Sequence, residues 1–296
     1  MSRIDTHHHH PPGQQPLGRV TVIGLGLIGG SLGQVLCALG ASEQVTGWDS
    51  EPATLASALQ HHAIHRSAGN ITDAVADADL VVICVPINCV TPVLLEVASA
   101  VGDSTVVTDV SSAKERIVVA GEAIIGPRFV GGHPMAGSEE SGFSASSVDL
   151  FDAAVWILTP TSRTDPEAVD LVSRMADWSG ATSRLCSPEE HDKYVGYLSH
   201  LPHIAAFGLA AAAKSGVPDE WKDIAAGSFK GGTRVALSDP TQWAEIIRDN
   251  RHSAIAALSQ YRSWLDETME SLESDNATSL ASLLQTGHSA RKQFPR

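Results

Sequence analysis

A glycine-rich turn follows the first apolar run of the chain and reads Gly24-Leu25-Gly26-Leu27-Ile28-Gly29. In this pattern the first glycine permits a tight turn, the second lets backbone amides approach a pyrophosphate, and the third lets the next helix pack closely on the strand. The N-terminus of that helix then faces the phosphates with its partial positive charge. The spacing predicts a dinucleotide-binding turn; the alternative is that the glycines only form a tight connection.

An acidic residue, Asp49, lies twenty residues beyond Gly29, at the end of a second predicted strand. A carboxylate in that position can accept hydrogen bonds from both ribose hydroxyls of NAD, and it would repel the 2′-phosphate of NADP. The next residues, Ser50 and Glu51, provide no arginine to compensate that phosphate. The sequence therefore predicts NAD as the cofactor and favours it over NADP.

Three polar residues further along the chain are suited to catalysis or to anion binding. His133 lies beside Pro134 in a glycine-rich loop, where a neutral imidazole can accept a hydrogen bond, although such a histidine is often structural. Ser112 follows a predicted strand end, where ligands gather in doubly wound sheets; its alternative role is to cap a helix over 113–121. Arg234 can grip a carboxylate through two parallel hydrogen bonds, or it can form a surface salt bridge.

The elements that position these residues alternate between short apolar strands and helices. The predicted strands cover 20–23, 44–48, 80–85, 105–108, 129–130 and 155–158, and the clearest helix between them covers 88–100. Strands that alternate with helices indicate βαβ units and a mostly parallel sheet. The predicted fold class is therefore α/β, beginning with a Rossmann-like nucleotide-binding domain.

The pattern changes near Ser187, where Ser187-Pro188-Glu189-Glu190 predicts a helix cap followed by proline and two acids. Helical periodicity then runs through 190–214, 218–228, 240–273 and 276–288, without a convincing strand. We therefore expect an NAD-binding domain over 19–185 and an all-helical domain over 186–296. Residues 1–18, which contain a run of four histidines from His7 to His10, are expected to form a disordered tail.

The composition limits the partners and the compartment. There are 20 Lys and Arg against 34 Asp and Glu, a net charge of −14, and no basic run, so neither nucleic acid nor an anionic membrane surface is an expected partner. The longest apolar run, 204–213, is too short to span a bilayer. The four cysteines have no metal-like spacing, so we expect reduced thiols, no metal site and a cytoplasmic location.

Several further stretches, together with the glycine turn, point to one family. They read Asp109-Val110-Ser111-Ser112-Ala113-Lys114, Gly132-His133-Pro134-Met135-Ala136-Gly137, Ser199-His200-Leu201-Pro202-His203, and Thr233-Arg234-Val235-Ala236 leading to Asp239-Pro240 and Trp243. In order and spacing they resemble the prephenate/arogenate dehydrogenase family of tyrosine biosynthesis, over about residues 19–290. The resemblance implies NAD-dependent oxidative decarboxylation of prephenate to 4-hydroxyphenylpyruvate, with arogenate as the alternative substrate.

The resemblance also implies roles for single residues. It makes His133 the catalytic acceptor for the substrate hydroxyl, and it makes Arg234 the anchor of a substrate carboxylate. From its place after a strand end, the Ser112 hydroxyl can bond to both the substrate hydroxyl and His133. Glu139 matches a family position near the mouth of the site, where it could gate access or balance charge. His191 also matches a family position, and we expect it to be structural or to support the site.

Two residues of the helical domain share a helix face, because Ser199 and His203 are four positions apart. We expect both at the substrate, with a buried structural role as the alternative for His203, while His200 is expected to be structural. Pro202 should kink this helix. Pro86, after the strand that begins at residue 80, is expected to shape the loop beside the nicotinamide.

One departure from the family pattern bears on the substrate. The residue three positions before Arg234 is often acidic in such families and is Gly231 here. The absence of a carboxylate there favours prephenate over the amine-bearing arogenate, although Glu139 can play a similar part. Two more distant alternatives are a β-hydroxyacid-type dehydrogenase, whose lysine motif is not matched around Lys193, and a non-catalytic dinucleotide sensor, which would not need the catalytic residues.

The helical domain carries long apolar stripes, such as that over 246–265, and resembles the dimerisation domain of this family. The resemblance implies a homodimer in which each active site can borrow residues from the partner. Periodicity alone is equally compatible with a monomeric helical bundle.

Overall fold

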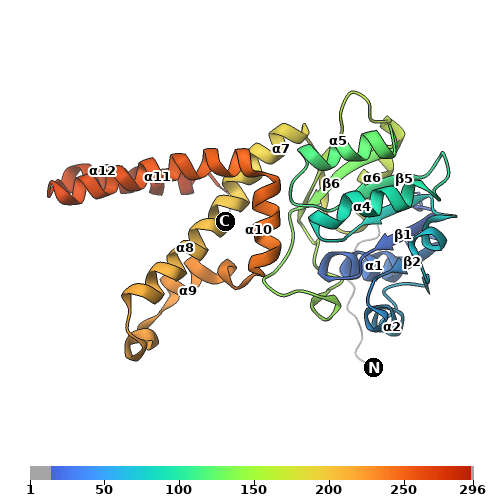
Figure 1. The fold of residues 1–296 in the computed structure, drawn as a ribbon, viewed down its shortest axis with the longest axis horizontal. Coiled ribbons are helices and arrows are strands. Elements are labelled where there is room, and N and C mark those ends of the chain that lie inside the picture. Colours follow the sequence, from blue (N-terminus) through green and yellow to red (C-terminus); the bar gives the residue numbers. More distant parts are fainter. Residues whose placement is uncertain (1–14, 295–296) are drawn as a thin grey trace.

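The computed structural model describes residues 15–294, which form a sheet covered by helices and a helical region that extends away from it (Figure 1). The strands are β1 (Arg19–Ile23), β2 (Gln44–Trp48), β3 (Arg66–Ser67), β4 (Leu80–Ile83), β5 (Val106–Asp109), β6 (Phe129–Pro134), β7 (Val155–Thr159) and β8 (Thr182–Leu185). The helices between them are α1 (Leu27–Leu39), α2 (Pro52–Gln60), α3 (Ile71–Val75), α4 (Ile87–Ala98), α5 (Glu115–Ile124), the short 3₁₀ turn η1 (Phe143–Ala145) and α6 (Pro166–Trp178).

The eight strands form one sheet in the order β3-β2-β1-β4-β5-β6-β7-β8. Strands β1 to β6 are mutually parallel, β7 is antiparallel to β6, and β8 is parallel to β7. The chain winds outward in both directions from the centre, and the direction switches between β1 and β4. Such a switch point opens a crevice at the carboxyl ends of the strands, where nucleotides bind in doubly wound sheets. The α/β fold with a Rossmann-like first domain is therefore confirmed.

Two apolar layers form, one on each face of the sheet. Side chains of β1 and β4 alternate between the layers, so that Val22 and Val82 contribute to one and Ile23 and Ile83 to the other. Helices α1 and α6 cover the first face, and α3, α4 and α5 cover the second. This burial on both faces explains why the sequence of β4 is a continuous apolar run.

Most predicted strands are present within a residue or two of their predicted bounds, but two strands were not expected. β3 has only two residues. β8 reads Thr-Ser-Arg-Leu and has an exposed edge position in the sheet, so it lacks the apolar pattern of a buried strand. Both are edge strands, and their pairing with a neighbour decides their conformation more than their own residues do.

The expected disordered tail over 1–18 is too long. Residues 1–14, with the histidine run, lie outside the described residues, but the next four belong to the folded domain. Leu17 is only 2% exposed and donates its backbone N–H to Ala41. The carbonyl of Gln15 accepts from the indole of Trp178.

The remaining chain, from residue 187 to 294, is helical in the structure, as predicted. It comprises α7 (Pro188–Val195), the π-helical turn η2 (Gly196–His200), α8 (Leu201–Gly216), the 3₁₀ segment η3 (Asp219–Ile224), α9 (Gly227–Thr233), the 3₁₀ turn η4 (Arg234–Leu237), α10 (Pro240–Asp249), α11 (Arg251–Glu273) and α12 (Ala277–Arg291). The kink expected at Pro202 takes the form of the π-turn that precedes it. Proline lacks the N–H that would bond four residues back, so the preceding turn widens.

The helical periodicity expected over 240–273 is divided between two helices at Asn250. Helix α10 returns to the first domain, where Ile246 is buried in the layer formed by α4 and α5. Helices α11 and α12 contact each other and project away from the sheet (Figure 1). Over the described residues, no helix is both long and apolar enough to cross a membrane.

Candidate active site

The glycine turn lies between β1 and α1, at the switch point of the sheet. Gly24 has a φ of +88°, and a Cβ there would lie 2.5 Å from the Cys84 carbonyl oxygen at the end of β4. A Cβ on Gly29 would lie 1.9 Å from the Gly24 carbonyl oxygen, so only glycine lets the helix approach this closely. A Cβ on Gly26 would meet nothing within 4 Å. The first and third glycines thus serve the turn and its packing, whereas the second leaves open space at the start of α1.

The open space at Gly26 fits a pyrophosphate. Gly26 is the N-cap of α1 and makes no side-chain capping hydrogen bond, and the residues that follow it, Leu27 and Ile28, begin the helix. The first backbone N–H groups of a helix have no partner within the helix. They are therefore available to an anion, whose negative charge the helix dipole also favours.

Asp49 follows β2 directly and its carboxylate is held at the turn. One oxygen, Oδ2, accepts from the Leu25 N–H at 2.8 Å, and Oδ1 accepts from the Glu51 N–H at 2.9 Å. Each carboxylate oxygen can accept a second hydrogen bond. The group is therefore fixed in orientation and keeps acceptor capacity for a diol. Pro86 is exposed at the N-cap of α4, after the adjacent strand.

Ser112 lies in the loop between β5 and α5 and is partly exposed. The helix-cap alternative is wrong for this residue, because α5 begins at Glu115, with Lys114 at the N-cap position. Ser111 is not the cap either, since its buried Oγ has no hydrogen-bond partner. The cap comes from Asp192 of α7, which accepts the Lys114 N–H at 2.7 Å and the Glu115 N–H at 3.0 Å.

A fully buried ion pair lies beneath this loop. The Lys114 ammonium donates to Asp109 at 2.5 Å and to the Gly132 carbonyl at 2.8 Å. Asp109 also accepts from the N–H groups of Ser111 and Gly132. Burial lowers the pKa of Lys114, and the Asp109 charge opposes that shift. The pair ties the end of β5 to β6 and so fixes the backbone that precedes His133.

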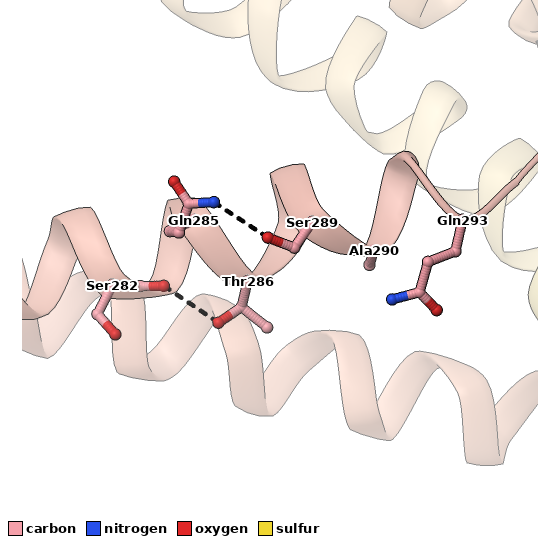
Figure 2. Close-up of a pocket in the computed structure, with 6 residues that line it drawn as sticks. All are labelled: Ser282, Gln285, Thr286, Ser289, Ala290 and Gln293. Carbon is pink, nitrogen blue, oxygen red and sulfur yellow. Dashed lines mark hydrogen bonds between the residues drawn. The ribbon is translucent and has the colours of Figure 1, made fainter.

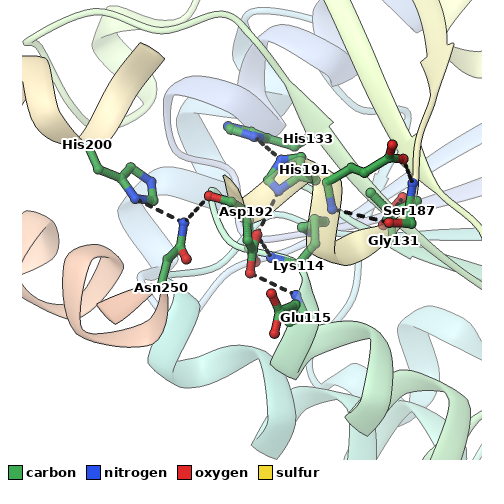
Figure 3. Close-up of polar contacts among 12 residues, drawn as sticks. Lys114, Glu115, Gly131, His133, Ser187, His191, Asp192, His200 and Asn250 are labelled. Atoms are coloured by element: carbon green, nitrogen blue, oxygen red, sulfur yellow. Dashed lines mark hydrogen bonds and ion pairs between the residues drawn. The ribbon is translucent and has the colours of Figure 1, made fainter. Parts of the chain in front are cut away.

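His133 lies at the carboxyl end of β6, with 7% of the residue exposed. Its Nδ1 is 2.8 Å from Nε2 of His191, and Nδ1 of His191 is 2.7 Å from Oδ1 of Asp192 (Figure 3). Burial holds the pKa of His133 well below its ordinary value of 6.5, and the nearby His191, Lys114 and His200 act in the same direction. His133 is therefore neutral near pH 7.

His200 is fully buried at the end of the π-turn. Its Nδ1 lies 3.2 Å from the amide nitrogen of Asn250, which also donates to the Asp192 carbonyl at 2.7 Å (Figure 3). Burial lowers the pKa of His200 to about 4, while Asp192 and the Ser112 backbone partly oppose the shift. The break between α10 and α11 thus places Asn250 where it connects His200 with α7.

The two predicted residues Ser199 and His203 do lie together. Nδ1 of His203 is 2.9 Å from the Ser199 carbonyl oxygen, and the His203 ring stacks on Trp243 with 3.4 Å between ring centroids. Burial lowers the pKa of His203, and Arg234 contributes to that shift. His203 is half-buried and so is available at the surface of this cluster.

Arg234 and Glu139 contact each other across the two domains. The Arg234 guanidinium is 2.6 Å from the Glu139 carboxylate, and their side chains are 58% and 30% exposed. A hydrogen bond from its own backbone and the Arg234 charge lower the pKa of Glu139. A pair this exposed contributes little to stability and can exchange partners readily.

The sequence identified only part of the support of His133, since His191 was expected to be structural or to support the site. The Lys114 backbone fixes the start of α5 only through Asp192. Neither Asp192 nor Asn250 was singled out, although the sequence offers one signal: an acidic residue directly beside His191.

Elsewhere, an open hollow on α12 is lined by side chains without charge, and Figure 2 shows two of its hydrogen bonds. It lies on the projecting arm and shares no residue with the site around His133.

Comparisons with known proteins agree with this arrangement. Residues 32–185 match the family described as prephenate dehydrogenase, nucleotide-binding domain, and residues 187–286 match prephenate dehydrogenase, dimerization domain. The prephenate dehydrogenase of Bacillus subtilis is 31% identical over 281 residues, which cover 93% of this chain and 76% of that protein.

Two solved structures are also similar. Prephenate dehydrogenase of Aquifex aeolicus, in complex with hydroxyphenyl propionate and NAD+, has a TM-score of 0.88 and 30% identity, covering 95% of this chain and 99% of that chain. Synechocystis arogenate dehydrogenase has a TM-score of 0.80 and 27% identity, covering 94% and 100%. The chain belongs to the prephenate dehydrogenase family.

Proposed function

We propose that the protein catalyses the NAD-dependent oxidative decarboxylation of prephenate to 4-hydroxyphenylpyruvate. The observation that carries this proposal is the position of His133. Its buried, neutral imidazole lies at the carboxyl end of β6, on the same edge of the sheet as the glycine turn. The Arg234 guanidinium extends from the helical domain to contact Glu139 of the first domain. Family membership supports the same reaction and disfavours the β-hydroxyacid and sensor alternatives.

The residues of the first domain suit NAD. The open space at Gly26 and the start of α1 would receive the pyrophosphate, and Asp49 would accept from the ribose hydroxyls. A 2′-phosphate would face the Asp49 carboxylate, so NAD is favoured over NADP. When bound, NAD accepts the hydride that leaves the hydroxyl-bearing carbon. Pro86 would border the nicotinamide from the adjacent strand end.

His133 would accept the hydrogen bond of the substrate hydroxyl. A neutral imidazole is needed for this role, and the lowered pKa keeps it neutral. Ser112 lies in the neighbouring loop at the end of β5, with its hydroxyl released from helix capping. It would bond to the same substrate hydroxyl and orient it toward His133.

Arg234 would anchor a substrate carboxylate, with Ser199 and His203 beside it. The contact of the guanidinium with the Glu139 carboxylate supports this role, because a substrate carboxylate has the same chemistry. The substrate carboxylate would displace Glu139, which would then remain at the mouth of the site. Gly231 provides no carboxylate for the ammonium of arogenate, so prephenate is the favoured substrate.

We also propose that the boundary between the two domains lies between residues 185 and 186, and that the protein forms a homodimer through the helical domain. The helices of the projecting arm have few buried residues: three of the 23 in α11 and none in α12. Large apolar side chains are exposed on them, at 61% for Ile255, 57% for Met269 and 60% for Leu272. Large apolar side chains exposed along helices that bury so little of their own surface favour a protein interface. Light scattering coupled to gel filtration should give twice the chain mass of 31.1 kDa.

The four cysteines are free thiols, which agrees with a cytoplasmic location. The activity is tested by offering the purified protein prephenate or arogenate with NAD or NADP and following the absorbance of the reduced nicotinamide. We expect the highest kcat/KM with prephenate and NAD. Reduction only with arogenate would overturn the substrate, and no reduction with any of the four pairs would overturn the enzyme.

A further inference from the structure

A chain of buried polar contacts runs from His133 into the helical domain. It passes from Nδ1 of His133 to Nε2 of His191, and from Nδ1 of His191 to Asp192 (Figure 3). We propose that His191 and Asp192 are positioning residues which fix His133 in the tautomer with hydrogen on Nδ1, leaving Nε2 as the bare acceptor. The tautomer follows from the contacts and the burial of the two rings; only its use in catalysis rests on the proposed function.

The order of donors and acceptors is set at Asp192. Its Oδ1 accepts the Lys114 N–H and its Oδ2 accepts the Glu115 N–H, at the N-terminus of α5. Backbone N–H groups can only donate, so both carboxylate oxygens act as acceptors at this helix end. The helix dipole also favours the negative charge at this end. Toward His191, Asp192 can therefore act only as an acceptor.

His191 must then carry its hydrogen on Nδ1. Burial lowers the pKa of His191, so its ring is neutral and holds only one hydrogen. Its Nε2 is consequently a bare acceptor. The contact between Nε2 of His191 and Nδ1 of His133 needs one hydrogen, and only His133 can supply it. His133 is neutral as well, so its own Nε2 carries no hydrogen.

The elements that form the chain are independently fixed. Ser187 and Glu190 form a reciprocal capping box at the start of α7, with two hydrogen bonds of 3.1 Å. Asn250 holds the Asp192 carbonyl from the other side. His191 and Asp192 therefore have defined positions, and the contacts to His133 and α5 do not depend on mobile side chains.

The arrangement defines where the proton goes. In the proposed reaction the substrate carbon would lose its hydride to bound NAD while the hydroxyl O–H bond breaks and its proton forms an N–H bond at Nε2 of His133. The positive charge on that ring is stabilised through Nδ1–H by His191, and the Asp192 carboxylate lies behind it. The bond between the substrate ring and its carboxylate carbon then breaks and CO2 leaves. The electrons of that bond make the ring aromatic, and the proton returns to the oxygen attached to the ring. No net acid or base is consumed.

The direct test is ¹⁵N NMR of histidine-labelled full-length protein without substrate or cofactor, with resonances assigned from His133→Asn and His191→Asn. We expect His133 to show a protonated Nδ1 and a pyridine-like Nε2. A protonated Nε2 in the folded protein would overturn the proposal. Because no reaction is measured, this result is separate from any failure of the proposed activity.

Variants give a second, functional test. His191→Gln keeps an amide oxygen near the position of Nε2, whereas His191→Leu offers no acceptor. We expect kcat to fall at least tenfold further in His191→Leu than in His191→Gln, with the Kd for NAD within about threefold of the parent in both. Equal kcat values in the two variants, or an unchanged His133 tautomer in His191→Leu, would contradict the proposal.

Asp192→Asn should lower kcat about 100-fold or more, since an amide nitrogen can donate to His191 and reverse the chain of hydrogen bonds. Asp249→Asn is the matched control, because Asp249 pairs with the exposed Arg116 and lies outside the chain to His133. Its kcat should remain near that of the parent. Comparable losses in the two variants would show that Asp192 acts only through packing. The NMR measurement on the parent protein holds even if Asp192→Asn fails to fold.

Discussion

The three glycines of the turn have different surroundings, and this difference predicts opposite effects for two similar substitutions. Gly29→Ala would place a methyl group 1.9 Å from the Gly24 carbonyl oxygen and 3.0 Å from Cβ of Cys84. Gly26→Ala would place the same methyl group in open space, on an extended backbone with φ −70° and ψ −154°. The first should therefore damage the fold and the second only the ligand site.

The expected size of each effect follows from these contacts. Overpacking costs about 1–3 kcal/mol or more, and here the obstacle is backbone, although alanine regains up to about 1 kcal/mol as the better helix former. A net loss of about 2 kcal/mol would lower the Tm by roughly 4–8 °C. For Gly26→Ala the fold should be unchanged or slightly stabilised. Its NAD affinity should fall about 10- to 100-fold, because hydrogen bonds to a charged group contribute about 1.5–3 kcal/mol.

Scanning fluorimetry without ligand and calorimetric titration with NAD measure the two effects separately. The reasoning is refuted if Gly26→Ala binds NAD as tightly as the parent, since the space at Gly26 would then not hold the pyrophosphate. It is also refuted if Gly29→Ala melts at the parental temperature. A third variant, Gly69→Ala, substitutes a glycine with no neighbour within 4 Å of its Cβ position and lies outside the turn, so it should change neither quantity.

Three further predictions concern the site. His133→Asn should lower kcat by about two to four orders of magnitude and leave the Kd for NAD nearly unchanged; steady-state kinetics and NAD titration would contradict this if both parameters changed together. Arg234→Gln should raise KM for prephenate about 10- to 100-fold with a smaller effect on kcat, and an unchanged KM would remove Arg234 from the substrate site. Burial lowers the pKa of His200 in the folded state to about 4. The unfolded state therefore binds more protons below pH 6.5, so the free energy of unfolding should fall as the pH drops from about 6.5 toward 4. The contribution is on the order of 3 kcal/mol, and urea unfolding of the parent and His200→Gln at pH 7.5 and 5 should show a shallower decline in the variant.

The parts of the fold that depend on local sequence were predictable. The glycine turn, the apolar run of β4 and the cap at Ser187 each depend on residues within one short segment. The edge strand β8 and the helix break at Asn250 were not predictable, because both depend on distant partners. Asn250 interrupts the helical pattern at the point where its amide bonds to the Asp192 carbonyl, 58 positions away along the chain.

The same distinction applies to the site. His133, Ser112 and Arg234 were identified from motifs, and the structure shows which contacts surround them. The role of His191 could not be specified from the sequence, since its contact with His133 spans 58 positions and depends on how α7 packs against β6. For Ser112, the sequence offered a helix cap as the alternative, and the structure excludes it because the cap comes from another domain.

The Asp192 carboxylate interlocks the two halves of the molecule. It caps a helix of the nucleotide-binding half through two backbone bonds and orients an imidazole of its own half through a third. A hinge motion that separated α7 from α5 would disconnect His133 from its orienting partners while leaving the glycine turn intact. Such a motion would leave NAD affinity unchanged and impair proton acceptance by His133. An isolated amino-terminal fragment would therefore still bind NAD but would lack the groups that orient His133.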